Sequence, residues 1–143
     1  MVLFSCNTID IFEKFESFPK NDWHVSKQPV FSFEVKDTSV PYHIYFVIRH
    51  TDAYKYNNIW VNIITQSPVG TKQTQLVNVK LADNTNGWLG AGMDDIFDSR
   101  IKITKAPVAL KAGVYTFTIA QAMRDEPLVE VLSAGIRVEK AMP

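Results

Sequence analysis

The sequence has a single cysteine, so an internal disulfide cannot stabilise the fold. It also lacks an excess of charge of either sign, because fifteen basic residues balance fifteen acidic ones. This balance gives no electrostatic preference for nucleic acid or for an anionic membrane surface. No segment has the apolar length of a transmembrane helix. The fold must therefore rest on a hydrophobic core, and 143 residues, 46% of them hydrophobic, supply one core but not two domains.

Motifs for catalysis, metals and nucleotides are missing as well. The chain has no Gly-x-Ser-x-Gly elbow and no His-Glu-x-x-His pair, and its three histidines lack metal-ligand spacing. The glycines of residues 87–92 do not follow the dinucleotide fingerprint, and Asp94 and Asp95 lack the spacing of a calcium loop. A triad assembled from distant residues leaves no local signature, so it stays open. We expect a protein that is not an enzyme and that needs no metal or cofactor.

What the sequence does contain is a repeated alternation of apolar and polar residues, which is typical of strands with one buried face. Turn residues, such as the Ser-Pro-Val-Gly of residues 67–70, separate the alternating segments, and Pro127 interrupts the best helical candidate at residues 120–132. The pattern predicts an all-β fold, an antiparallel β-sandwich of jelly-roll type with about eight strands. The predicted strands cover residues 31–35, 42–49, 59–64, 77–81, 115–119 and 136–138, with weaker ones at 100–103 and 108–110.

The strong strands also predict a core. Each has an apolar face, and a sandwich buries such faces between its two sheets. We therefore expect one buried core that contains Phe33, Phe46, Val61, Phe117 and Ile136.

The cysteine stands where a lipid anchor would be attached. Leu3, Phe4 and Ser5 precede Cys6, and a short apolar run that ends in a small residue before a cysteine resembles a bacterial lipobox. In a lipoprotein the thiol of that cysteine receives a diacylglycerol, and the preceding peptide is removed. The pattern predicts lipidation of Cys6, with residues 1–5 as the remnant of a signal peptide. The alternative is an incidental free thiol.

Three segments distinguish this chain from an ordinary sandwich. They read RHTDAYKYNNIW at residues 49–60, GWLGAGMDDI at residues 87–96 and GVYTFTIAQAMR at residues 113–124, the last followed by GIRVEK at residues 135–140. Together with Trp23 they resemble the GldH family of gliding motility lipoproteins from Bacteroidetes envelopes. The resemblance runs from Cys6 almost to the C-terminus.

The resemblance implies a lipid-anchored protein of the cell envelope that faces the periplasm and assists gliding motility and the protein secretion linked to it. Its implied partners are other envelope or motility proteins, together with the membrane reached through the lipid on Cys6. The family has no accepted catalytic residues to transfer. The expected organisation is a signal-peptide remnant at residues 1–5, a lipid-anchored tether at residues 6–21 and a β-sandwich domain at residues 22–143.

The connection at residues 49–60 has two interpretations. In the first, its polar residues form a charge-assisted network that holds the connection in one shape. In the second, its aromatic residues present flat faces that anchor a partner protein or stack on a sugar ring. The polar residues are Arg49, His50 and Asp52, and the aromatic ones are Tyr54, Tyr56 and Trp60.

The glycines of the second segment permit positive φ angles and let Trp88 fold against the sandwich. Binding groups collect on the loops of a rigid scaffold, so we expect the two connections to form one protein-binding surface bordered by Arg49 and Arg124. A carbohydrate-binding module, supported by fold analogy, is the alternative. The candidate surface comprises Arg49, His50, Asp52, Tyr54, Tyr56, Trp60, Trp88, Asp94, Asp95 and Arg124.

Overall fold

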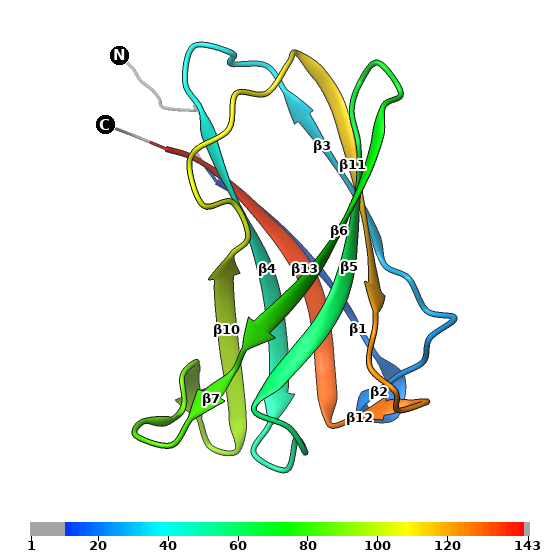
Figure 1. The fold of residues 1–143 in the computed structure, drawn as a ribbon, viewed down its shortest axis with the longest axis vertical. Helices are drawn as coiled ribbons and strands as arrows, with labels where there is room; N and C mark the ends of the chain where they lie inside the picture. The colour runs from blue at the N-terminus through cyan, green and yellow to red at the C-terminus, as the bar shows by residue number, and fades with distance from the viewer. Residues whose placement is uncertain (1–10, 142–143) are drawn as a thin grey trace, which may run out of the picture.

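The computed structural model describes residues 11–141, which form an antiparallel sandwich of two sheets (Figure 1). The five-stranded sheet has the order β1 (Ile11–Ser17), β13 (Val131–Lys140), β4 (Tyr42–Thr51), β10 (Ile96–Lys102) and β9 (Ala91–Met93). The four-stranded sheet has the order β3 (Val30–Val35), β11 (Gly113–Gln121), β5 (Asn58–Gln66) and β6 (Lys72–Lys80). The remaining elements are the pair β12 (Leu128–Val129) with β2 (Asp22–Trp23), the pair β7 (Ala82–Asp83) with β8 (Gly87–Trp88), and a 3-10 turn, η1 (Pro19–Asn21).

The predicted all-β antiparallel sandwich is confirmed, but the predicted count of about eight strands is too low. Residues 11–141 form thirteen strands. Four of them, β2, β7, β8 and β12, have two residues each, which is too short for an alternating pattern to be recognised. The weak strand predicted at residues 108–110 makes only an isolated bridge, between Val108 and Tyr42.

The tether predicted at residues 6–21 is corrected by β1 and η1, which place residues 11–21 in the sandwich. All seven residues of β1 pair with β13. Phe12 faces the core, where its ring centroid lies 5.0 Å from that of Phe33. Lys14 and Glu16 lie on the same side of this edge strand, so the sequence shows no apolar alternation there. Cys6 and the predicted signal-peptide remnant lie outside the described residues.

The core between the sheets contains the predicted residues. Phe46, Val61, Phe117 and Ile136 are each 0% exposed, and Phe33 packs against them from the margin, partly buried. They come from both sheets, so the two layers share one hydrophobic core. The prediction of a single core is confirmed.

Residues 11–141 contain no helix that is both long enough and apolar enough to cross a membrane.

The two ends of the sandwich differ in what they carry. The start of β1 and the end of β13 lie at one end, and the connections that follow β4 and β11 lie at the other (Figure 1). Across the five-stranded sheet, Ile11 is level with His43, and Ser17 is level with Arg49. Six residues of extended strand separate these levels, which corresponds to about 20 Å. We call the end with the connections after β4 and β11 the distal end.

Candidate functional site

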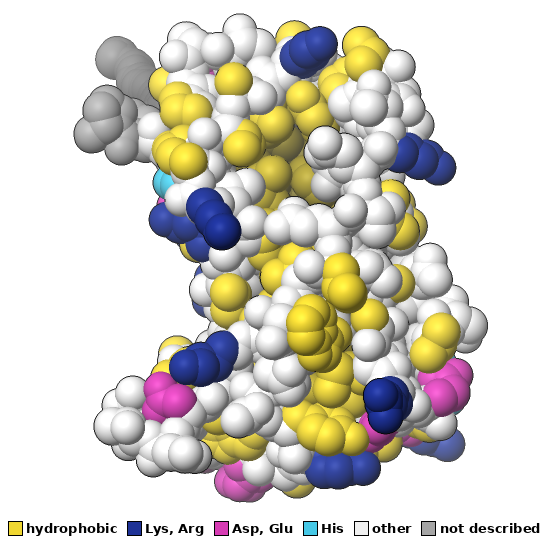
Figure 2. Space-filling model, viewed as in Figure 1, with side chains coloured by type: hydrophobic (Ala, Val, Ile, Leu, Met, Phe, Trp, Pro, Cys, Tyr) yellow, Lys and Arg dark blue, Asp and Glu magenta, His cyan; other side chains and the backbone are white. Residues whose placement is uncertain are grey.

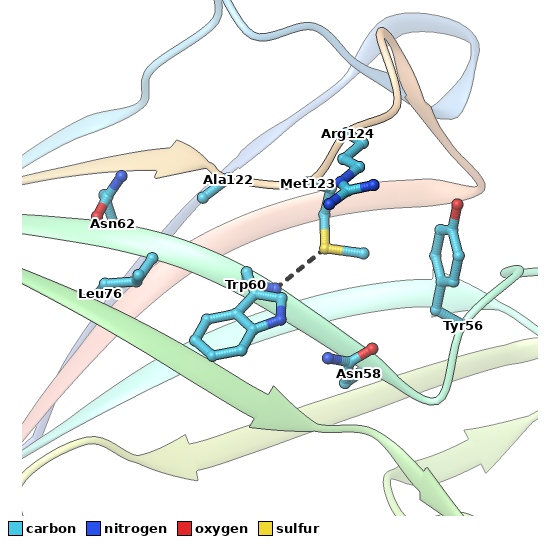
Figure 3. Close-up of a pocket in the computed structure, with 8 residues that line it drawn as sticks. All are labelled: Tyr56, Asn58, Trp60, Asn62, Leu76, Ala122, Met123 and Arg124. Atoms are coloured by element: carbon cyan, nitrogen blue, oxygen red, sulfur yellow. Dashed lines mark hydrogen bonds between the residues drawn. The ribbon is translucent and has the colours of Figure 1, made fainter.

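A groove of about 580 Å³ opens beside the outer side of the four-stranded sheet, towards the distal end. In Figure 3, Leu76 lies to one side of the Trp60 ring and Tyr56 to the other, with Met123 and Arg124 above. The groove is built from β5, β6, the connection before β5 and the segment after β11. We call it the Trp60 groove, and its lining residues are Tyr56, Asn58, Trp60, Asn62, Leu76, Ala122, Met123 and Arg124.

Two large apolar side chains point outward here. Ile59 and Val61 are fully buried, so Trp60 between them faces solvent and is 38% exposed. On β6, Leu76 is paired with Asn62 and is 58% exposed. Because Leu76 and Trp60 are diagonal neighbours on adjacent strands, they form one apolar floor.

The pairing of β5 with β11 is incomplete beside Trp60. β11 pairs with β5 only as far as Gln121, which lies opposite Val61. Beyond this point the N–H of Ala122 still donates to the carbonyl of Trp60 at 2.9 Å, but the N–H of Trp60 reaches the Sδ of Met123 at 3.2 Å. A thioether is a weak acceptor, so this backbone donor lacks a strong partner in the described chain.

Hydrogen bonds fix the rim of the groove. The buried side chain of Gln121 donates from Nε2 to the carbonyl of Asp125 at 2.9 Å and accepts at Oε1 from the N–H of Met123 at 2.8 Å. The carboxylate of Asp125 accepts from the Tyr56 hydroxyl at 2.8 Å and lies 3.2 Å from the Nζ of Lys55. The hydrogen bond from Tyr56, followed by the contact with Lys55, holds the pKa of Asp125 below its usual range. The rim is therefore ordered before a ligand arrives.

Arg124 differs from the other three arginines of the chain. Each of those three makes an ion pair with a carboxylate, whereas the guanidinium of Arg124 has no carboxylate partner among residues 11–141. It lies over the groove beside Met123 (Figure 3). Its charge is therefore available to an acidic ligand. The paired arginines are Arg49 with Asp98, Arg100 with Glu13, and Arg137 with Glu13 and Glu139.

Three residues of the candidate surface pack together instead of facing a partner. His50 is fully buried, Tyr54 is 4% exposed, and the centroid of the His50 ring lies 4.6 Å from that of Trp88 and 5.6 Å from that of Tyr54. The Tyr54 hydroxyl donates to the carbonyl of Asn58 at 2.8 Å. Burial lowers the pKa of His50 and raises the pKa of Tyr54. As predicted, Trp88 folds against the sandwich, and the cluster fixes both connections to it.

The polar network predicted around Arg49 and Asp52 does not form. Arg49 donates to both carboxylate oxygens of Asp98, at 2.7 and 3.2 Å, because β4 and β10 place the two residues opposite each other. Asp52 contributes its backbone N–H, which donates to the carbonyl of Asp95 at 2.9 Å. Asp94 lines a separate recess that also contains Arg49 and Asp98.

The candidate residues therefore do not form one surface. Arg49 points outward from the five-stranded sheet and Arg124 lines the groove beside the four-stranded sheet, so they do not border the same patch. Among residues 11–141, no group of three or more His, Cys, Asp or Glu side chains is arranged to hold a metal ion. The groove contains Tyr56, Trp60 and Arg124, the packed cluster contains His50, Tyr54 and Trp88, and the region of β9 and β10 contains Arg49, Asp52, Asp94 and Asp95.

The candidate surface omitted five of the eight lining residues, and the two with large apolar side chains are Leu76 and Met123. Leu76 precedes Val77 and Val79 on β6, so it is apolar at a position where the alternation calls for a polar side chain. This departure from the apolar–polar alternation is a signal by which Leu76 could have been identified. Met123 has no such signal, because it reaches Trp60 only through the path of the turn after β11.

Comparison with known proteins identifies the family. The family model described as GldH lipoprotein matches residues 10–138. The chain belongs to the GldH lipoprotein family. It is 26% identical to the gliding motility lipoprotein GldH of Flavobacterium johnsoniae, over 98% of this chain and 91% of the relative. It is 24% identical to a gliding motility lipoprotein GldH homolog of Christiangramia forsetii, over 99% of this chain and 91% of that relative.

The resemblance drawn from the three sequence segments is therefore confirmed. Membership of the GldH family makes this a motility-related lipoprotein, consistent with a lipid-anchored location in the cell envelope. A carbohydrate-binding module specific for non-crystalline cellulose aligns with a TM-score of 0.38 and 15% identity, over 97% of this chain and 76% of that one. A chain of infectious bursal disease virus, Gx strain, aligns with a TM-score of 0.41 and 11% identity, over 91% of this chain and 32% of that one.

Proposed function

We propose that this GldH-family protein is a lipid-anchored, periplasm-facing accessory of the gliding motility and associated secretion machinery. It acts by binding another envelope protein and not by catalysis. The binding surface is the Trp60 groove together with the outer side of the four-stranded sheet. The observation that carries the proposal is the composition of that outer side.

The outer side of the four-stranded sheet has an uncharged centre. Its few charged residues, Glu34, Lys72 and Lys80, stand towards strand ends, and large apolar residues are exposed between them. Figure 2 shows hydrophobic side chains along the middle of this view, in its upper and lower halves, with lysine and arginine mainly towards the margins. Uncharged interface centres with apolar anchors are typical of protein-binding surfaces. We call this surface the neutral face, and its central residues are Val30, Ser32, Trp60, Asn62, Ile64, Thr74, Leu76, Asn78, Thr116, Thr118 and Ala120.

The position of the groove suits a protein that is anchored at Cys6. Four residues separate Cys6 from Ile11, and the five Cα-to-Cα steps between them span at most about 17 Å. A lipid on Cys6 therefore keeps the end of the sandwich that carries Ile11 close to the membrane. The Trp60 groove, towards the distal end, then points away from the lipid and is open to a partner in the periplasm.

Photocrosslinking in cells tests the binding surface. A photoreactive amino acid at Leu76 of the full native protein is expected to give discrete crosslinked protein products, whereas the same group at Lys102, on the outer side of the five-stranded sheet, is expected to give none. Trp60→Ala should remove the products from the Leu76 position. Equal products from both positions, or none from either, contradict the proposal. Binding of the purified protein to neutral glycans that depends on Trp60, without protein crosslinks, would replace it with carbohydrate recognition.

A clickable fatty acid tests the anchor. The native protein is expected to incorporate the label and to fractionate with membranes, because two acyl chains give durable attachment. Cys6→Ala should lose both the label and the membrane fraction. Equal labelling of the two proteins, or no labelling of either, contradicts lipidation at this residue.

A further inference from the structure

We propose that the Trp60 groove binds an extended, acidic segment of a partner protein. The segment places an apolar side chain on Trp60 and Leu76, a backbone carbonyl on the N–H of Trp60 and an Asp or Glu carboxylate on Arg124. This inference rests on the proposed function and names the chemistry of the partner. Three independent features of the groove support it.

The first feature is the apolar floor. Trp60 is 38% exposed and Leu76 is 58% exposed, and Met123 packs against the Trp60 backbone at the rim. A tryptophan beside an aliphatic side chain is the composition of an anchor pocket that buries one apolar residue of a partner. The amides of Asn58 and Asn62 flank the floor and supply hydrogen-bond donors and acceptors on either side of it.

The second feature is the incompletely paired backbone of β5 at Trp60, where the carbonyl accepts from Ala122 but the N–H has no oxygen acceptor. The N–H of Trp60 donates only to the thioether of Met123, at 3.2 Å, where a continuous sheet would supply a carbonyl from β11. A carbonyl of an incoming peptide is a stronger acceptor than a thioether. Extended peptides commonly bind by adding main-chain hydrogen bonds to an exposed strand, while pockets read alternate side chains. The groove places a backbone N–H without a strong acceptor beside an apolar pocket.

The third feature is the charge. Arg124 is the arginine that has no carboxylate partner within residues 11–141, and none of the eight lining residues is acidic. The neighbouring Asp125 is held by Tyr56 and Lys55, so it does not neutralise Arg124. Arginine binds carboxylates through paired charge-assisted hydrogen bonds. A neutral sugar would cover Trp60 but leave this guanidinium unmatched, so the charge favours an acidic peptide.

A displayed library of random dodecapeptides tests the inference on the purified full chain, with removal of peptides that also bind Trp60→Ala. The selected peptides are expected to share an Asp or Glu at a fixed distance from an apolar residue. Synthetic capped peptides from the selection are then compared with versions that carry Asn or Gln in place of the acid.

Arg124→Gln is expected to weaken binding of the acidic peptide about tenfold or more, and the amide peptide should bind about as weakly to the wild type. The amide peptide should lose little further affinity on Arg124→Gln, because the two changes remove the same contact. Lys72→Gln is the matched control: it removes one positive charge at the other end of β6 and should leave binding unchanged.

Selection of no peptide, selection of peptides without an acid, or equal binding to Arg124→Gln and the wild type would overturn the inference. The proposed function is judged separately, by crosslinking from Leu76 in cells. Protein crosslinks that persist in Arg124→Gln but not in Trp60→Ala would retain the proposed function and reject the acidic segment. The absence of crosslinks from Leu76 rejects the proposed function itself.

Discussion

The outer sides of the two sheets differ in how many charged residues they carry. On the five-stranded sheet the charged side chains are numerous and make ion pairs with one another, both within a strand and between strands. On the neutral face of the four-stranded sheet, polar amides and hydroxyls surround exposed apolar residues. The zero net charge of the chain conceals this difference between the two faces. We call the outer side of the five-stranded sheet the charged face, and its paired residues are Glu13, Arg49, Asp98, Arg100, Arg137 and Glu139.

Glu13 is the centre of the charged face. It accepts from Arg100 at 2.7 and 2.8 Å and from Arg137 at 3.0 Å, so it connects β1, β13 and β10. The hydrogen bond from Arg100 is the main cause that holds the pKa of Glu13 below its usual value. Phe15 lies beside this network, opposite Gly135, where any larger side chain would run into the backbone of β1. These groups are satisfied within the chain, which leaves little for a partner to bind.

The difference between the faces indicates that one stabilises the sheet and the other is suited to binding. Ion pairs on the charged face fasten the edge strand β1, whose core-facing side carries only one apolar residue, Phe12. The four-stranded sheet does not depend on such ion pairs, because its central strands β5 and β11 have buried inner residues such as Ile63 and Ile119. Its outward positions are therefore free to carry apolar residues for recognition.

The largest expected effect comes from the core that both faces share. Phe117 is 0% exposed in the central strand β11, and its truncation to alanine should cost about 3–5 kcal/mol of unfolding free energy. Both faces should be lost in one transition, because they rest on the same core. Denaturant unfolding measures the loss, and an unchanged midpoint would show that the assigned register of β11 is wrong.

A smaller loss is expected from the charged face. Glu13→Ala removes the carboxylate shared by two arginines, and we expect a loss of about 1–2 kcal/mol, because exposed pairs contribute up to about 1 kcal/mol each and Glu13 is only 20% exposed. The pKa of Glu13 is lowered in the folded state, so its contribution is present above about pH 4.5 and declines as the pH falls further. Thermal unfolding between pH 7 and pH 3 should show a shallower acid limb in the variant. Parallel curves would contradict this role.

A third effect, confined to mildly acid pH, is expected from the layer between the faces. Burial lowers the pKa of His50 below 6.5, so the unfolded chain binds a proton there that the folded chain does not. Stability should therefore fall as the pH drops below about 6.5, by no more than about 1.4 kcal/mol per pH unit. Thermal midpoints of the wild type and His50→Leu between pH 8 and pH 5.5 measure this slope. The slope should disappear in the variant, whatever its absolute stability, and an identical slope in both proteins would assign the effect to another group.

The central strands were predictable because burial on one side leaves a clear period of two. Ile59, Val61 and Ile63 show this pattern, and the structure places them in β5 with all three side chains buried. β1 was not predictable in the same way, since Phe12 faces the core and Phe15 faces solvent. An edge strand held by ion pairs carries no apolar period that a sequence pattern could detect.

The candidate site was predicted only in part, for a related reason. The sequence indicated that Tyr56, Trp60 and Arg124 belong to binding connections, and the structure brings these three together in the Trp60 groove. It could not show that Tyr54 turns inward to pack beside His50, because that depends on how the connection after β4 folds over the distal end. Aromatic residues in a connection thus serve two purposes, and only their burial separates the two.

The smallest effect on stability, with the largest effect on binding, is expected at Leu76. Leu76→Thr introduces a β-branched residue, which strands accept well, and removes an apolar side chain that is 58% exposed, so the unfolding free energy should change by less than about 0.5 kcal/mol. The matched variant is Phe15→Thr, which removes an apolar side chain that is 51% exposed from the charged face. Crosslinking from Asn62, a neighbour of Leu76 on the neutral face, measures partner binding in both. Leu76→Thr should abolish the crosslinked products and Phe15→Thr should preserve them, because only the neutral face contacts the partner. The reverse result would exchange the roles of the two faces.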